Sequence, residues 1–158
     1  MPIARLKTIT ATSLLLALAA CSSPAYHKQM RSTHIDKTKI IDTARAQLGV
    51  DYRYGGESPT EGFDCSGLVF YSYQLAGIRI PRTTRGQLQQ ARPISKRHLN
   101  RGDLLFFRIY QSRVSHVGIY LGGKRFIHAP ATGKSVSIAR LDTPYWQKRF
   151  IRGGRIYN

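Results

Sequence analysis

The segment that most constrains this chain is FDCSGLV at residues 63–69, because it places a cysteine where a helix should begin. Asp64 is a typical helix cap, and apolar residues follow Cys65 at close to helical spacing until Gly77 ends the pattern. A thiol in the first turn of a helix lies at the positive end of the helix dipole, which favours the reactive thiolate. A single cysteine on an apolar helix is more commonly a small buried side chain, so the rest of the chain must decide between a nucleophile and a core residue.

Length and charge narrow the classes of protein to consider. The 158 residues are enough for one domain with a sizeable core, and the chain has no internal repeat, low-complexity tract or second domain. It has 25 basic and 8 acidic residues, a formal net charge of +17. Such an excess favours an anionic partner or environment, such as a nucleic acid, a membrane surface or an acidic polymer, and does not choose among them.

The N-terminus has the features of a lipoprotein signal peptide at residues 1–20. A short basic start precedes an apolar run that is too short to span a bilayer, and small residues stand directly before Cys21. These residues resemble a bacterial lipobox, which implies that Cys21 is lipidated after cleavage; the alternative is an ordinary cleaved signal that leaves Cys21 as a plain thiol. With Ser22 in place of an aspartate, the resemblance implies a lipid anchor in the outer membrane of a Gram-negative bacterium, facing the periplasm.

Residues 21–37 are polar and without periodicity, and we expect them to form a flexible tether behind the lipidated cysteine. Residues 1–20 hold two of the basic and none of the acidic residues, so the exported chain keeps a charge of +15. Two cysteines in an oxidising compartment could form a disulfide, but lipidation of Cys21 excludes it. Cys65 would then be a free thiol, which is unusual in that compartment and points to a function.

The remaining residues, 38–158, change from helical to strand patterns along the chain. Helices are expected at residues 38–48, from Cys65 to Gly77, and from Thr83 or Thr84 to Ala91, with a structured loop at 51–62. After residue 102, short β-branched or aromatic runs predict strands at 103–108, 115–121, 124–129, 135–140 and 154–157. Helices first and strands afterwards predict an α+β domain with an antiparallel sheet.

Two histidines, His116 and His128, lie on neighbouring predicted strands. Strand alternation places His116 on the same face as Gly118, opposite to an apolar face. Because the glycine leaves room, we expect the Cys65 helix to pack on the histidine face and bring thiol and imidazole together.

The hairpin between the two strands decides whether both histidines share a face. A two-residue turn at Gly122 and Gly123 would put His116 and His128 on opposite faces, whereas a three-residue loop that includes Lys124 puts them on the same face. Gly123 can supply the left-handed residue that such a loop needs. We therefore predict an odd-length loop or a bulge here.

A thiol and two imidazoles on one side of a sheet are sufficient for covalent catalysis. The Cys65 thiolate would attack a carbonyl carbon, with His116 as the base that takes the thiol proton and later protonates the leaving amine. His128 would orient that ring and fix its tautomer. Taken singly, each histidine is more commonly a structural side chain, and only their joint occurrence with a helix-starting cysteine favours catalysis.

Several blocks of the sequence resemble those of a known family. FDCSGLV at 63–69, SHVGIYLG at 115–122 and FIHAP at 126–130, in this order, look like the three catalytic blocks of the NlpC family of papain-like bacterial cell-wall cysteine peptidases. YRYGG at 52–56, IPRTTRGQ at 80–87 and RGDLLFF at 101–107 look like its intervening blocks, and PYWQKRF at 144–150 resembles the end of its enterobacterial lipoprotein members. The resemblance covers about residues 38–158. It implies a papain-like α+β fold with N-terminal helices and the nucleophile helix packed on a five- to six-stranded antiparallel sheet.

The resemblance also implies a function and a set of site residues. Members of this family hydrolyse peptidoglycan stem peptides, at the D-glutamyl-diaminopimelate bond or the diaminopimelate-D-alanine cross-link. For this chain we expect a monomer without a cofactor or metal. The positions that match family site residues are the nucleophile Cys65, the base His116, the third member His128, Tyr52 near the thiol, and Asp64 and Ser66 in the substrate cleft.

Two charged residues near the motif keep two interpretations each. Asp64 beside the thiol opposes thiolate formation, so it either caps the helix or binds a cationic amino group of the substrate, and one side chain could do both. Arg82 is either a cleft residue that contacts substrate or a surface charge.

Other functions remain open on sequence alone. An acyltransferase or another amidase could use the same scaffold and the same acyl-thioester chemistry, and a wall-binding lipoprotein would need no catalysis. Nucleic-acid binding is the last choice, because export removes the usual partner and no base-reading motif accompanies the charge.

Overall fold

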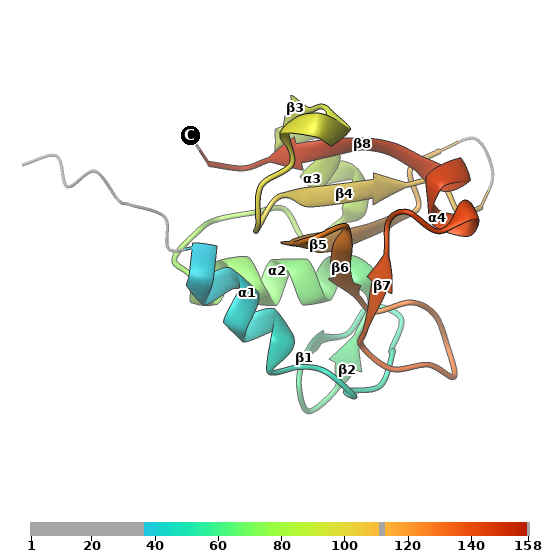
Figure 1. The fold of residues 1–158 in the computed structure, drawn as a ribbon. Helices are drawn as coiled ribbons and strands as arrows, with labels where there is room; N and C mark the ends of the chain where they lie inside the picture. The colour runs from blue at the N-terminus through green and yellow to red at the C-terminus, as the bar shows by residue number, and fades with distance from the viewer. Residues whose placement is uncertain (1–36, 111–112, 158) are drawn as a thin grey trace, which may run out of the picture. The chain divides into compact units, whose positions relative to one another are not determined.

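The computed structural model describes residues 37–110 and 113–157 (Figure 1). The elements follow in the order α1 (Lys37–Arg45), β1 (Glu57–Ser58), β2 (Gly62–Phe63), α2 (Cys65–Leu75), α3 (Thr84–Gln90), β3 (Arg92–Ile94), the 3₁₀ helix η1 (Lys96–His98), β4 (Leu104–Phe107), β5 (His116–Gly122), β6 (Arg125–His128), β7 (Ser137–Arg140), α4 (Pro144–Arg149) and β8 (Phe150–Arg155). The predicted signal peptide, the lipidated Cys21 and all but the last residue of the predicted tether lie outside the described residues. Within the described ranges, no helix has both the length and the apolar content needed to cross a membrane.

The helix that carries the cysteine begins and ends close to where the sequence predicts. Asp64 has extended backbone angles and its carboxylate accepts the amide of Gly67, so it caps α2. After the helix, Gly77 adopts a φ of 78°, which a glycine allows at no steric cost. The first helix is shorter than predicted: α1 ends at Arg45, and Leu48 is 46% exposed where the helical pattern placed it on the buried face.

The sheet confirms the α+β prediction. Six strands pair in the order β3-β8-β4-β5-β6-β7, and every pair is antiparallel. The predicted strands at 103–108, 115–121, 124–129 and 135–140 correspond to β4 to β7, and the last strand, β8, starts four residues earlier than predicted. The short edge strand β3, the hairpin of β1 and β2 and the helix α4 were not predicted, because each is shorter than the window in which a period can be recognised.

Apolar side chains form two clusters, one on each face of the sheet. One cluster joins α1 and α2 to the sheet face that carries Val117 and Ile119. The other contains Phe107 and Phe126, with Trp146 of α4 packed against it. Figure 1 shows α1 and α2 running along one side of the sheet, while α4 lies where β8 begins, away from α1.

This arrangement corrects the expected packing of the cysteine helix. Helix α2 covers the Val117 face, and the Gly118 face, which includes His116, is turned away from it. The glycine instead makes room for a ring within the sheet, since a Cβ on Gly118 would lie 2.7 Å from Cδ2 of Phe126. The histidine face is therefore lined with aromatic rings, including that of Trp146 in α4, and not with α2.

The hairpin between β5 and β6 places both histidines on one face of the sheet, as the sequence predicts. A two-residue turn at Gly123 and Lys124 has positive φ at both positions, 56° and 60°. The pairing shifts by one residue between Tyr120 and Gly122, so a bulge in β5 offsets the even turn. As a result, His116 and His128 lie on the same face, as the predicted bulge requires.

Candidate active site

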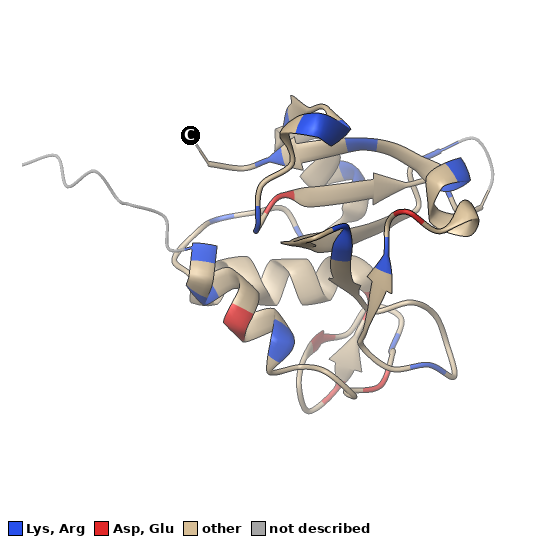
Figure 2. Cartoon of the chain, in the orientation of Figure 1, with Lys and Arg blue, Asp and Glu red and all other residues tan. Residues whose placement is uncertain are grey.

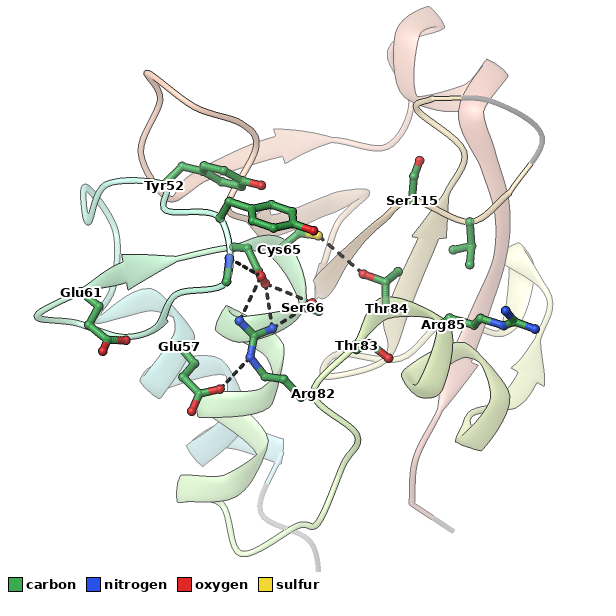
Figure 3. Close-up of a pocket in the computed structure, with 14 residues that line it drawn as sticks. Tyr52, Glu57, Glu61, Cys65, Ser66, Arg82, Thr83, Thr84, Arg85 and Ser115 are labelled. Carbon is green, nitrogen blue, oxygen red and sulfur yellow. Dashed lines mark hydrogen bonds and ion pairs between the residues drawn. The ribbon is translucent and has the colours of Figure 1, made fainter.

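Cys65 lies in a pocket of about 790 Å³ that opens beside the first turn of α2. Figure 3 shows this pocket with the side chains of Tyr52, Arg82 and Thr84 around the cysteine. The lining residues come from residues 52–61 around β1, the start of α2, the start of α3 and the segment before β5, namely Tyr52, Tyr54, Gly55, Glu57, Glu61, Asp64, Cys65, Ser66, Arg82, Thr83, Thr84, Arg85, Val114 and Ser115. A cavity of this size can accept several atoms on each side of a scissile bond.

The sulfur of Cys65 has hydrogen-bonding groups from three elements around it. Its Sγ lies 3.7 Å from Oγ1 of Thr84. Backbone amides of Val117 in β5 and Ser66 in α2 also bond to it, and both lower the pKa of the thiol. Because the Val117 amide belongs to the peptide that follows His116, the thiol lies next to the backbone of the predicted base.

The resting thiol is nevertheless protonated, which corrects the expectation from the helix dipole alone. Burial raises the pKa of Cys65, the Thr84 and Val117 hydrogen bonds lower it, and the nearby Asp64 carboxylate raises it; the net shift is upward. Proton removal by a base is therefore required before this thiol can attack a substrate.

The two histidines are in direct contact. Nε2 of His116 and Nδ1 of His128 are 2.8 Å apart, and the rings are nearly perpendicular at 89°. In the described part of the chain Nδ1 of His116 has no hydrogen bond, and the one fully buried side-chain N or O atom without a partner there is Oε1 of Gln87. The second imidazole therefore holds Nε2 of His116 and leaves Nδ1 unengaged.

Both imidazoles are neutral at physiological pH. Burial lowers the pKa of His116 to about 3, with a contribution from His128, and burial lowers the pKa of His128 to about 4. A neutral imidazole is the form that can accept a thiol proton. No hydrogen bond joins the Cys65 sulfur and the His116 ring among the described residues, so the thiol–imidazole pair stays a prediction, while the imidazole pair is part of the structure.

Asp64 and Arg82 form one ion-paired unit at the side of the pocket. Nη1 and Nη2 of Arg82 donate to Oδ1 and Oδ2 of Asp64, both at 3.0 Å, and Nε donates to Glu57 at 2.6 Å. Burial opposes ionisation of Asp64, but hydrogen bonds from Arg82 and from the amide of Gly67 outweigh it and hold the pKa of that carboxyl below its usual value. Ser66 joins the unit, since its Oγ donates to Asp64 and accepts from Arg82.

This ion pair helps to choose between the two interpretations given above for Arg82 and for Asp64. Arg82 is a cleft residue and not a free surface charge, because it lines the pocket and binds Asp64. Asp64 is the helix cap, and both of its oxygens already accept hydrogen bonds. A substrate ammonium would have to share the carboxylate with Arg82, and that contact stays a prediction, as do contacts of Tyr52, Ser66 and Arg82 with substrate.

Comparison with known proteins agrees with this geometry. The family model described as "NlpC/P60 family" matches residues 49–155, which includes Cys65, His116 and His128. The chain belongs to the NlpC/P60 family. One relative, murein DD-endopeptidase MepH of Escherichia coli K12, is 41% identical over 133 residues, which are 82% of this chain and 48% of the relative. The chain thus spans about half the length of that relative.

Solved structures of NlpC/P60 proteins have the same fold. An NlpC/P60 family protein from Bacillus cereus matches with a TM-score of 0.73 and 35% identity, over 78% of this chain and 41% of the other. The NlpC/p60 domain of the peptidoglycan hydrolase SagA matches with a TM-score of 0.67 and 33% identity, over 77% of this chain and 99% of that domain. The papain-like α+β prediction is therefore confirmed.

The NlpC/P60 domain gathers its few acidic residues at the pocket. Four of the eight acidic residues lie between residues 51 and 64, and Glu57, Glu61 and Asp64 line the pocket. Figure 2 shows these red segments near β1 and β2, with Lys and Arg spread over the other elements. In residues 37–110 and 113–157, no three His, Cys, Asp or Glu side chains gather where they could hold a metal ion.

Two residues of this NlpC/P60 site were missed on sequence. Thr84 was placed only at the start of a predicted helix, although its hydroxyl contacts the thiol. Trp146 was noted only within a family block, although its ring stacks on His116. Both lie in blocks that resemble those of the family, IPRTTRGQ and PYWQKRF. Neither a threonine nor a tryptophan is marked as a site residue by its type alone.

Proposed function

We propose that this protein is a cysteine peptidase that hydrolyses an amide bond in peptidoglycan stem peptides. The observation that carries the proposal is the pocket itself: Cys65 faces it from the first turn of α2, beside the backbone of His116. The names of similar proteins support the substrate class, since MepH is a murein DD-endopeptidase and SagA a peptidoglycan hydrolase.

The reaction follows from the protonation states of the resting groups. Nδ1 of His116 accepts the proton of the Cys65 thiol, and the sulfur attacks the carbonyl carbon of the stem peptide. The carbon–nitrogen bond breaks, and the imidazolium of His116 gives its proton to the leaving amine. Water then attacks the thioester, with His116 again as base, and releases the new carboxylate and the free thiol.

The imidazole pair prepares His116 to accept the thiol proton and later to donate it to the leaving amine. Its Nε2 is held at 2.8 Å from Nδ1 of His128, which fixes the plane of the ring. Only one of these two nitrogens carries a proton in the neutral pair, so the hydrogen bond links the tautomers of the two rings. A His116 that donates from Nε2 leaves Nδ1 unprotonated and ready to accept the thiol proton.

We propose that the bond cleaved is the diaminopimelate-D-alanine cross-link, because MepH, at 41% identity, is named for DD-endopeptidase activity. The test is digestion of two purified muropeptides, a cross-linked dimer and a monomer with an intact D-glutamyl-diaminopimelate bond. Mass spectrometry of the new termini should show the dimer converted to monomers and the single stem intact. Cleavage within the single stem instead would assign the D-glutamyl-diaminopimelate bond.

The same experiment separates hydrolysis from acyl transfer on this scaffold. A hydrolase adds one water to each product pair, whereas an acyltransferase moves the acyl group to an added amine or lipid acceptor. Intact substrate with both the protein and the Cys65→Ala variant bound to sacculi would instead favour a wall-binding lipoprotein.

We further propose that the mature protein is anchored in the outer membrane through lipid on Cys21 and faces the periplasm. The support is the apolar run and small residues that precede Cys21 in the sequence. Cells fed a radiolabelled fatty acid should label the wild-type protein, and Cys21→Ala should lose both the label and the outer-membrane fraction. Equal labelling of the two proteins would contradict the anchor.

A further inference from the structure

Among the described residues, Trp146 of α4 is the one aromatic ring that contacts both site histidines and is also partly exposed. Its ring stacks on His116, with 5.6 Å between centroids and 29° between planes. It meets His128 edge to face at 5.0 Å and 89°. The two imidazoles are only 4% and 3% exposed, while Trp146 is half-buried, so the indole is the layer between the pair and water.

The fold holds Trp146 in this place from both ends of a short helix. Within α4, the side chain of Gln147 donates to the carbonyl of Asp142, which precedes the helix, at 2.7 Å and so closes the loop from β7. After it, the amide of Arg108 donates to the carbonyl of Arg149 at 2.8 Å, and β8 continues into the pairing with β4. The helix thus bridges two strands of the sheet, and its tryptophan is fixed over the histidine face.

The rest of the histidine surroundings is aromatic and uncharged. Phe107 of β4 lies 6.1 Å from His116 and Phe126 of β6 lies 5.0 Å from His128, between ring centroids. The charges on α4 are those of Lys148 and Arg149, and the Arg149 guanidinium lies over the ring of Tyr145. In the described part of the chain, the only titratable group that acts on His116 is His128, and burial alone acts on His128.

We propose that Trp146 is a positioning residue of the catalytic centre, which seals the His116–His128 pair from water and stabilises the imidazolium that forms on His116. This inference rests on the proposed function, in which His116 is the base. Two physical effects carry it. Excluding water keeps the resting imidazoles neutral, and the face of an indole attracts a cation stacked on it.

These two effects can be separated with three substitutions. Trp146→Ala removes both the cover and the ring face, Trp146→Leu keeps an apolar cover without a π-face, and Trp146→Phe keeps both in smaller form. Phe150→Leu is the matched control, because it removes a ring that contacts Phe107 and, among the described residues, neither histidine.

The first readout is titration of the two imidazoles by NMR in the free protein, which needs no activity. The Ala variant should move both pKa values up toward 6.5, while the Leu variant and the Phe150→Leu control keep them low. The second readout is kcat and its pH profile on a cross-linked muropeptide. We expect kcat to fall about tenfold in the Leu variant and less in the Phe variant, with the acid limb shifted upward only in the Ala variant.

A third readout uses the fact that the chain has a single tryptophan. An imidazolium stacked on the indole quenches its fluorescence, so acidification of the wild-type protein should quench Trp146 with a midpoint well below pH 6.5, and His116→Asn should abolish that transition. If the Ala variant does not fold, the Leu and Phe variants decide the matter through kcat.

Unchanged imidazole titration in a folded Ala variant, or wild-type kcat in the Leu variant, would overturn the role of Trp146. Neither result touches the proposed peptidase activity, which depends on Cys65 and is measured on the wild-type protein. If the protein proves not to be a peptidase, the NMR titration still measures whether Trp146 shields the imidazole pair from water.

Discussion

At the scale of single residues, the thiol depends on a hydroxyl that belongs to another helix. Thr84 lies at the start of α3, 19 residues from Cys65, and its Oγ1 is 3.7 Å from the sulfur. This hydrogen bond lowers the pKa of the thiol against the larger upward effect of burial. Thr84 therefore supports the thiolate at the moment when the base removes the proton.

Replacing Thr84 by valine, which keeps the shape and removes the hydroxyl, should slow alkylation of Cys65 by iodoacetamide. One lost hydrogen bond to a thiolate corresponds to about 1–2 kcal/mol, so we expect the pH at half-maximal alkylation to rise by about one unit. Thr84→Ser keeps the hydroxyl and should retain the wild-type profile. Equal profiles for Val and wild type would mean that the hydroxyl does not stabilise the thiolate.

Some of these residues could be predicted from the sequence and others could not, for a physical reason. Cys65, Asp64 and the two histidines could be found because a helix start and a strand period fix where their side chains point. The ion pair of Asp64 with Arg82 and the contact of Thr84 with the thiol join segments whose separation in space no local pattern determines. Burial of Cys65, which reverses the effect of the helix dipole, also depends on tertiary packing.

At the scale of elements, the start of α2 is positioned by direct contact of backbones. A Cβ on Gly67 would clash with the carbonyl oxygen of Gly56 and lie 3.0 Å from Nη2 of Arg82. The amide of Asp64 donates to the same Gly56 carbonyl at 3.0 Å. A glycine is required at position 67 for the cysteine to lie this deep in the pocket.

Gly67→Ala should therefore lower both stability and activity. Backbone displacement of this kind typically costs about 1–3 kcal/mol, and it should move Cys65 away from the Val117 amide. Denaturant unfolding and muropeptide turnover measure the two effects. Gln74→Ala, at an exposed position of the same helix, is the control and should change neither; similar behaviour of the two variants would contradict close packing at Gly67.

The hairpin shows what sequence can determine about an element. The requirement that both histidines share a face predicted an odd loop or a bulge, and the bulge between Tyr120 and Gly122 confirmed it. The face against which α2 packs could not be read in the same way. Gly118 can make room either for a helix or for a neighbouring ring, and Phe126 supplies the ring.

At the scale of the whole molecule, the buried imidazole pair makes stability depend on pH. The folded pKa values of about 3 and about 4 lie below the ordinary value of 6.5, so the unfolded chain binds more protons as the pH falls below 6.5. The stabilisation is complete above that pH and is lost on acidification. With about 1.4 kcal/mol per pKa unit, lowering the pH from 6.5 to 5 costs about 2 kcal/mol for each histidine.

Urea unfolding at pH 7 and pH 5 should show this loss in the wild-type protein. A double variant, His116→Asn with His128→Asn, should lose much less between the two pH values. His98→Asn, which removes an exposed histidine, should behave as wild type. An equal loss in the double variant would mean that other groups cause the pH dependence.

In the proposed reaction, the Cys65 thiol, with His116 as its base, hydrolyses a peptidoglycan stem peptide. The most direct measurement is the rate at which purified variants cleave a cross-linked muropeptide dimer, followed by chromatography and mass spectrometry. We expect Cys65→Ala and His116→Ala to lose cleavage by about a thousandfold or more, while His128→Asn keeps part of it. Cleavage by His116→Ala at the wild-type rate would show that His116 is not the base.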